Sequence, residues 1–137
     1  MNAHFTPTEN RRWMLVDDNP RMLTVLSNLL ENLTTAKIEC HDLPQSALAA
    51  FAGAPKSYEL VITDLEMPGL DGVELCRRLR ATAPAQKIFL ATGSGFFTTD
   101  TARHAGFCAL RNKPFGLAEL SAALAAAGLA GEPARAL

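Results

Sequence analysis

Short apolar runs alternate along the chain with segments of helical periodicity. Four of the runs are compact and bounded by polar or turn-forming residues, as expected of buried strands. In a fifth run, polar and apolar residues alternate, which favours a strand at the edge of a sheet. The five predicted strands cover residues 13–16, 37–41, 60–62, 88–91 and 108–110.

Between the strands, apolar residues recur at the spacing of amphipathic helices. Asn19 is expected to cap the first helix and Pro20 to begin it, since proline lacks a donor that the first turn leaves unpaired. Asp71 can cap the third helix. The fourth is expected to be short or mobile, because its threonines are mediocre helix formers. The helices are predicted near residues 20–33, 44–53, 72–80, 98–105 and 117–127.

This alternation predicts an α/β fold with a doubly wound, flavodoxin-like parallel sheet of five strands and five helices. If the alternating second strand lies at an edge, the strand order is 2-1-3-4-5, and the first and third strands are neighbours. We expect one domain over residues 12–128, a flexible extension at 1–11 and a tail at 129–137.

The composition of the chain limits the classes of protein to which it can belong. The net charge of −1 argues against a nucleic-acid-binding surface. Cys40, Cys76 and Cys108 are widely separated, so we interpret them as reduced core residues. The N-terminus lacks the apolar core of a secretion signal, and no apolar stretch is long enough for membrane insertion. A soluble, cytoplasmic protein is expected.

Polar residues follow four of the predicted strands. Because the carboxyl ends of parallel strands share one edge, these residues are expected to lie together. They are Asp17 and Asp18 after the first strand, Asp64 after the third, Thr92 after the fourth and Lys113 after the fifth.

Three clustered carboxylates repel one another, by about 4 kcal/mol for a pair roughly 4 Å apart at an effective dielectric near 20. A hard divalent cation removes this conflict. Mg²⁺, or Mn²⁺, suits a site with few protein ligands and room for a phosphoryl group. Lys113 and Thr92 would add a positive charge and a donor for phosphoryl oxygens. A carboxylate so placed can also act as a nucleophile and form an acyl phosphate.

Four motifs then resemble those of a known family in order and approximate spacing: VDDNP at 16–20, DLEMPGLDG at 64–72, LATG at 90–93 and NKPF at 112–115. Between about Arg12 and Ala127 the chain resembles a receiver domain of two-component response regulators, of the single-domain, chemotaxis type. By this resemblance, Asp64 is the phosphoacceptor. Asp18, Asp64 and the backbone carbonyl of Glu66 are the Mg²⁺ ligands, and Asp17 holds the metal through water.

The resemblance also implies that Lys113 pairs with the phosphoryl group and that Thr92 moves toward it to trigger the conformational switch. Glu66 and Ser94 occupy positions that tune the phosphoryl lifetime. Pro114 matches a proline that typically follows a cis peptide bond.

The chain departs from the family at Leu110, where an aromatic residue is common. A leucine cannot make the ring movement that is coupled to Thr92. We hypothesise that the adjacent loop, with Phe96 and Phe97, responds to phosphorylation instead.

The implied function is a phosphorylation-activated switch that accepts a phosphoryl group on Asp64 from a sensor histidine kinase or a histidine phosphotransfer protein. It would signal through a partner bound at the fourth helix, fifth strand and fifth helix, without contacting nucleic acid directly. It would not be an enzyme beyond phosphotransfer to, and hydrolysis from, its own aspartate.

The alternatives are a relay intermediate, a phosphate sink, a pseudo-receiver adaptor that is not phosphorylated, and a receiver excised from a longer protein. A phosphatase of the haloacid dehalogenase type fits less well. Glu66 is longer than the aspartate expected there, and no cap segment fits.

Overall fold

The computed structural model describes residues 11–92, 109–112 and 117–126. Its sheet has five parallel strands in the order β2-β1-β3-β4-β5, which confirms the predicted fold class and order. The strands are β1 (Arg12–Val16), β2 (Lys37–His41), β3 (Tyr58–Thr63), β4 (Ile88–Thr92) and β5 (Ala109–Asn112).

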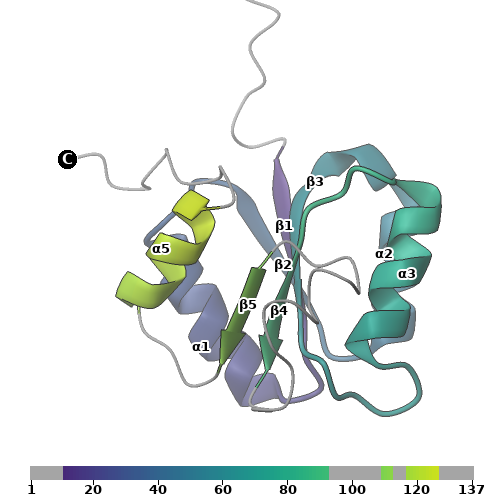
Figure 1. Ribbon diagram of the computed structural model, residues 1–137, viewed down its shortest axis with the longest axis horizontal. Coiled ribbons are helices and arrows are strands. Elements are labelled where there is room, and N and C mark those ends of the chain that lie inside the picture. Colours follow the sequence, from purple (N-terminus) through teal and green to yellow (C-terminus); the bar gives the residue numbers. More distant parts are fainter. Residues whose placement is uncertain (1–10, 93–108, 113–116, 127–137) are drawn as a thin grey trace, which may run out of the picture.

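Helices cover both faces of the sheet (Figure 1), with α1 and α5 on one face and α2 and α3 on the other. The helices are α1 (Pro20–Glu31), α2 (Pro44–Gly53), α3 (Gly72–Thr82) and α5 (Leu117–Ala126), and a 3₁₀ turn, Pro55–Ser57, precedes β3. The segment predicted as the fourth helix lies outside the described residues. In the described part of the chain, no helix is long and apolar enough to cross a membrane.

Two predicted helix starts are confirmed in atomic detail. The side chain of Asn19 accepts a hydrogen bond from the backbone of Arg21, with Pro20 as the first helical residue of α1. The side chain of Asp71 accepts one from the backbone N–H of Glu74 at the start of α3, at 2.9 Å. Each cap satisfies a backbone N–H that the first turn of its helix would otherwise leave unpaired.

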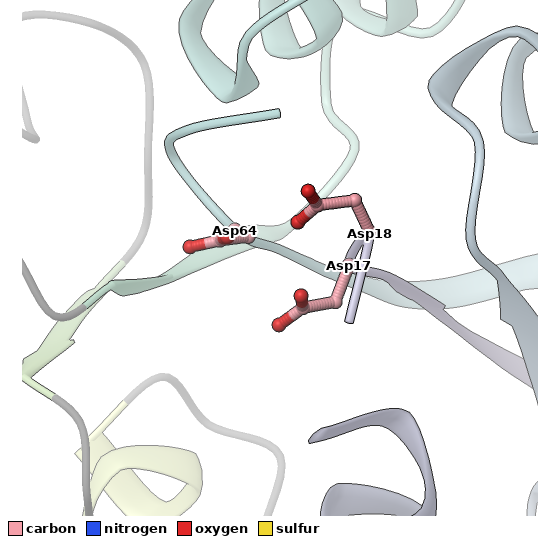
Figure 2. A group of neighbouring side chains, drawn as sticks. All are labelled: Asp17, Asp18 and Asp64. Atoms are coloured by element: carbon pink, nitrogen blue, oxygen red, sulfur yellow. The ribbon is translucent and has the colours of Figure 1, made fainter. Parts of the chain in front are cut away.

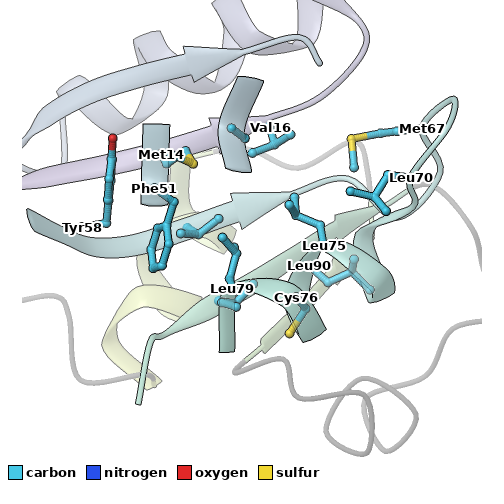
Figure 3. Packing of buried hydrophobic residues seen from close by; sticks show 13 residues of the cluster. Met14, Val16, Phe51, Tyr58, Met67, Leu70, Leu75, Cys76, Leu79 and Leu90 are labelled. Carbon is cyan, nitrogen blue, oxygen red and sulfur yellow. The ribbon is translucent and has the colours of Figure 1, made fainter. Parts of the chain in front are cut away.

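The sheet divides the apolar interior into two cores. Leu23, Leu26 and Leu30 of α1 pack with Leu120 and Leu124 of α5 on one face. The other core lies beneath α2 and α3 (Figure 3). Its buried residues are Met14, Val16, Ala47, Phe51, Tyr58, Val61, Met67, Leu70, Leu75, Cys76, Leu79, Ile88 and Leu90. Met67 and Leu70 belong to the loop after β3, so this core also anchors that loop.

The structure corrects two expectations. Cys40 is exposed, not part of the core, because it lies on the edge strand β2. Strand β5 extends to Asn112, beyond the predicted end at Leu110, because Ala91 and Thr92 of β4 still pair with its last two residues. Cys76 is buried as predicted, and Cys108 lies outside the described residues.

The carboxylate of Glu39 on the edge strand β2 forms hydrogen bonds that link β1, β2 and β3. Glu39 of β2 accepts bonds from the hydroxyl of Tyr58 at 2.8 Å, from Nε2 of His41 at 2.7 Å and from Arg12 at 3.3 Å. Burial raises the pKa of Glu39, but the bonds from His41 and Tyr58 and the attraction to His41 and Arg12 outweigh it. The pKa therefore lies below the ordinary glutamate value.

Candidate functional site

Three aspartates meet where β1 and β3 end (Figure 2). Asp17 and Asp18 directly follow β1, and Asp64 directly follows β3. Each offers a carboxylate oxygen that lies within 4.8 Å of those of the other two. The strands are neighbours in the sheet, so this cluster lies at the point where the strand order reverses, the usual ligand position in such folds.

The three carboxylates differ in their access to solvent. Asp17 is buried, with 2% of its surface exposed, whereas Asp18 is exposed and Asp64 is intermediate. Oδ1 of Asp17 accepts a hydrogen bond from the backbone N–H of Asn19 at 2.9 Å, and its own N–H donates to the carbonyl of His41 at 3.1 Å. A carboxylate held this deep is uncommon in a protein unless it is paired or binds a cation.

Hydrogen bonds hold both the backbone and the carboxylate of Asp64 in place. Its N–H donates to the carbonyl of Val16 on β1 at 2.9 Å. Its Oδ1 accepts from the N–H of Leu65 at 2.9 Å, and its carbonyl accepts from the hydroxyl of Thr63, also at 2.9 Å. The carboxylate is therefore part of a local network that restricts its rotation.

The loop from Asp64 to α3 closes tightly on itself. The N–H of Gly72 donates to the carbonyl of Leu65 at 2.7 Å. A Cβ at Gly72 would lie only 2.3 Å from the carbonyl oxygen of Asp64, so no larger residue fits without a shift of the backbone. Gly69 has a φ of +84°, which glycine adopts without strain.

The cluster has the donor set of a hard-cation site. At 4.8 Å two carboxylates repel by about 3.5 kcal/mol at an effective dielectric near 20. Oxygen ligands from a few carboxylates are what Mg²⁺ binds, with water completing its shell. The three residues therefore fit such an ion. No group other than oxygen is needed from this chain.

The other predicted site residues are only partly described. Thr92 is the last residue of β4, and Leu110 lies within β5, opposite Leu90, but their side chains are outside the described residues. Glu66 lies in the loop after β3 and is exposed. Ser94, Lys113 and Pro114, like Phe96 and Phe97, lie outside the described residues.

Sequence reasoning missed two contributors to the site, Thr63 and Gly72. A polar residue at the end of the apolar run of β3 was a signal for Thr63, which is fully buried. For Gly72 the signal was a glycine directly after the helix cap Asp71. Neither pattern, by itself, indicates contact with the carbonyl of Asp64.

A family model for the response regulator receiver domain matches residues 14–125. The chain therefore belongs to the receiver domain family of two-component response regulators, whose members act in phosphorylation-dependent signalling.

Individual proteins agree with this assignment. The transcriptional regulatory protein ResD of Bacillus subtilis is 33% identical over 88 residues, which are 64% of this chain and 35% of ResD. A receiver domain protein from Clostridium thermocellum has a TM-score of 0.77 and 25% identity, over 85% of this chain and 93% of that one. The response regulator TrrA of Thermotoga maritima, solved with Mg²⁺ and BeF, has a TM-score of 0.75 and 28% identity, over 85% and 98% of the two chains.

The chain matches only part of the length of its curated relatives. For five of them, the matched region spans between 13% and 58% of the relative's length. Four of these five relatives are named as transcriptional regulatory proteins, and this chain resembles one part of each.

Proposed function

We propose that this chain is a phosphorylation-activated switch whose phosphoacceptor is Asp64. The observation that carries the proposal is the cluster of Asp17, Asp18 and Asp64 at the carboxyl ends of β1 and β3, in a chain of the receiver family. Asp64 is partly accessible to solvent and held by backbone bonds, as a nucleophile that must meet a donor requires.

The proposed step is a displacement at phosphorus. A carboxylate oxygen of Asp64 forms the new P–O bond as the P–N bond of a phosphohistidine breaks, and the leaving imidazole keeps the electron pair and takes up a proton. The donor is a sensor histidine kinase or a histidine phosphotransfer protein. Any hydrolysis concerns this acyl phosphate alone, so the chain acts on no external substrate.

Mg²⁺ is the proposed cofactor. Asp18, Asp64 and the backbone carbonyl of Glu66 would hold it directly, and Asp17 through water. The ion supplies positive charge that neutralises the carboxylates and the incoming phosphoryl oxygens. Support comes from the oxygen-only donor set and from TrrA, a relative solved with Mg²⁺ and BeF.

Thr92, the last residue of β4, and Lys113, directly after β5, are proposed to contact the phosphoryl group. Lys113, which follows β5 in the sequence, would pair with it, and Thr92 at the end of β4 would donate to it. A downstream protein would then bind the region of the fourth helix, β5 and α5. We propose a cytoplasmic location, where sensor kinases present their phosphohistidine.

The test is phosphorylation by acetyl phosphate with Mg²⁺, followed by intact mass. We expect one added phosphoryl group on the native chain and none on Asp64→Asn. The matched control is Asp42→Asn, which removes an exposed acid after β2 and should leave phosphorylation unchanged. An unmodified native chain would favour the pseudo-receiver alternative, and modification of Asp64→Asn would reject Asp64 as acceptor.

A panel of phosphorylated sensor kinases and histidine phosphotransfer proteins would identify the donor. Transfer onward from the chain to a second phosphotransfer protein would indicate a relay intermediate. Rapid hydrolysis without transfer or partner binding would indicate a phosphate sink.

A further inference from the structure

Thr63, which precedes the proposed acceptor Asp64, is buried, and its hydroxyl donates a hydrogen bond to the backbone carbonyl of Asp64. We propose that the hydroxyl of Thr63 positions the carboxylate of Asp64 by holding the peptide group between Asp64 and Leu65. This inference rests on the proposed function. Thr63 would act through that peptide group and not touch the phosphoryl donor.

Two hydrogen bonds hold opposite ends of one peptide group. Its carbonyl, from Asp64, accepts from Oγ1 of Thr63 at 2.9 Å. Its N–H, from Leu65, donates to Oδ1 of Asp64 at 2.9 Å. A peptide group is planar, so fixing the carbonyl also fixes the direction of the N–H. Through that N–H, Thr63 sets the rotation of the carboxylate.

The surroundings of Thr63 leave its hydroxyl little choice of partner. Thr63 has 0% of its surface exposed, and its register partners on the flanking strands are Val16 and Leu90, both in the core beneath α2 and α3. A buried hydroxyl that loses its partner is penalised, because water cannot replace it. The β-branched side chain is also stiff at χ1, so the donor stays in one place.

The backbone of α3 restricts the same carbonyl. A Cβ on Gly72 would lie 2.3 Å from the carbonyl oxygen and 3.2 Å from the carbonyl carbon of Asp64. Rotation of the peptide group toward α3 is therefore blocked by close packing. The hydroxyl of Thr63 and the packing of Gly72 together restrict the rotation of this peptide group.

Orientation matters because the attacking oxygen must approach phosphorus in line with the leaving group. A misplacement of about 1 Å at a reacting group can cost on the order of a hundredfold in rate. Loss of one hydrogen bond on a peptide that Gly72 still restrains should displace the carboxylate less. We expect on the order of a tenfold slower phosphorylation.

The experiment compares Thr63→Val with Thr63→Ser in the full chain. Valine keeps the shape and removes the hydroxyl, and serine keeps the hydroxyl and removes a methyl group. Phosphorylation by acetyl phosphate is measured at saturating Mg²⁺, and the amide proton of Leu65 is observed by NMR before phosphorylation. Thermal unfolding shows that each variant is folded.

We expect Thr63→Val to slow phosphorylation and to move the Leu65 amide proton upfield, as its bond to Oδ1 weakens. Thr63→Ser should stay within about twofold of the native rate and near the native amide shift. A role in packing alone would not separate the two variants in this way. If Thr63→Val does not fold, Thr63→Ala provides the same comparison.

Native rate and amide shift in Thr63→Val would overturn the inference while leaving Asp64 as acceptor. Equal slowing in both variants would also overturn it, because the methyl group would then matter and not the hydroxyl. A native chain that takes up no phosphoryl group refutes the proposed function itself, a result that the native sample alone reveals.

Discussion

Because the three aspartates repel one another, the proposed binding of Mg²⁺ to the cluster should be measurable as a change in the stability of the fold. Replacement of Asp18 with asparagine removes one of three negative charges and keeps the size of the side chain. An oxygen of Asp18 lies within 4.8 Å of those of Asp17 and Asp64, so the change removes two repulsive pairs. The metal-free variant should therefore be more stable than the native chain.

Solvent exposure sets the size of the effect. At 4.8 Å a pair repels by about 3.5 kcal/mol at a dielectric near 20 and by about 0.9 kcal/mol at that of water. Asp18 is exposed, so the lower limit applies to each of its two pairs. The sum is about 2 kcal/mol, which corresponds to a rise in Tm of about 6 to 8 °C for a domain of this size.

Calorimetry in chelator and in Mg²⁺ provides the assay. At a hundredfold excess over Kd, Mg²⁺ should stabilise the native chain by about 2.7 kcal/mol. Asp18→Asn should lose most of this gain, because a neutral amide replaces a carboxylate that we propose binds the ion directly. Asp42→Asn, an exposed acid outside the cluster, controls for the change in net charge. A lower Tm for metal-free Asp18→Asn, or an equal response of both proteins to Mg²⁺, would refute the reasoning.

Three further perturbations test other parts of the site and fold. Gly72→Ala places a methyl group 2.3 Å from the carbonyl oxygen of Asp64, so we expect a loss of about 1 to 3 kcal/mol in denaturant unfolding; an unchanged midpoint would contradict this packing. Glu66→Ala should change the rate of phosphorylation or of hydrolysis, because an exposed carboxylate near the acceptor repels the incoming group; equal rates at matched Mg²⁺ would reject that role. The pKa of Glu39 is lowered in the folded state, so its contribution to the free energy of unfolding is present above the unfolded pKa and is lost as pH falls through the folded pKa. Glu39→Gln should therefore weaken the loss of stability at acid pH. An unchanged dependence of stability on acid pH would rule this out.

Most of the fold could be predicted from local patterns. Compact apolar runs marked the buried strands, and the alternation in β2 placed it at an edge. Asn19 and Asp71 are helix caps whose partners are two or three residues away, so their roles depend on local sequence alone. Strand ends were less certain, because the last residues of β5 are held by pairing with β4 and not by their own preferences.

The solvent exposure of individual side chains could not be predicted from such local patterns. Cys40 shares one face of β2 with Ile38 in the alternating pattern, so burial was expected. Cys40 is nevertheless exposed, because a strand at the edge of the sheet has a neighbouring strand on one side only. Asp17 and Asp18 are adjacent in the sequence, but one is buried and the other is exposed. Which of the two acids faces the interior depends on how the chain turns from β1 into α1.

The sequence by itself determined which residues are candidates for the chemistry: acids at the ends of two strands, with a threonine and a lysine at the ends of two others. Only the tertiary structure decided that the acids meet, because a parallel crossover brings together β1 and β3, which are some forty residues apart in the chain. It also placed the hydroxyl of Thr63 and the backbone of Gly72 against the carbonyl of Asp64. Such contacts depend on distances between packed elements, which a linear pattern does not contain.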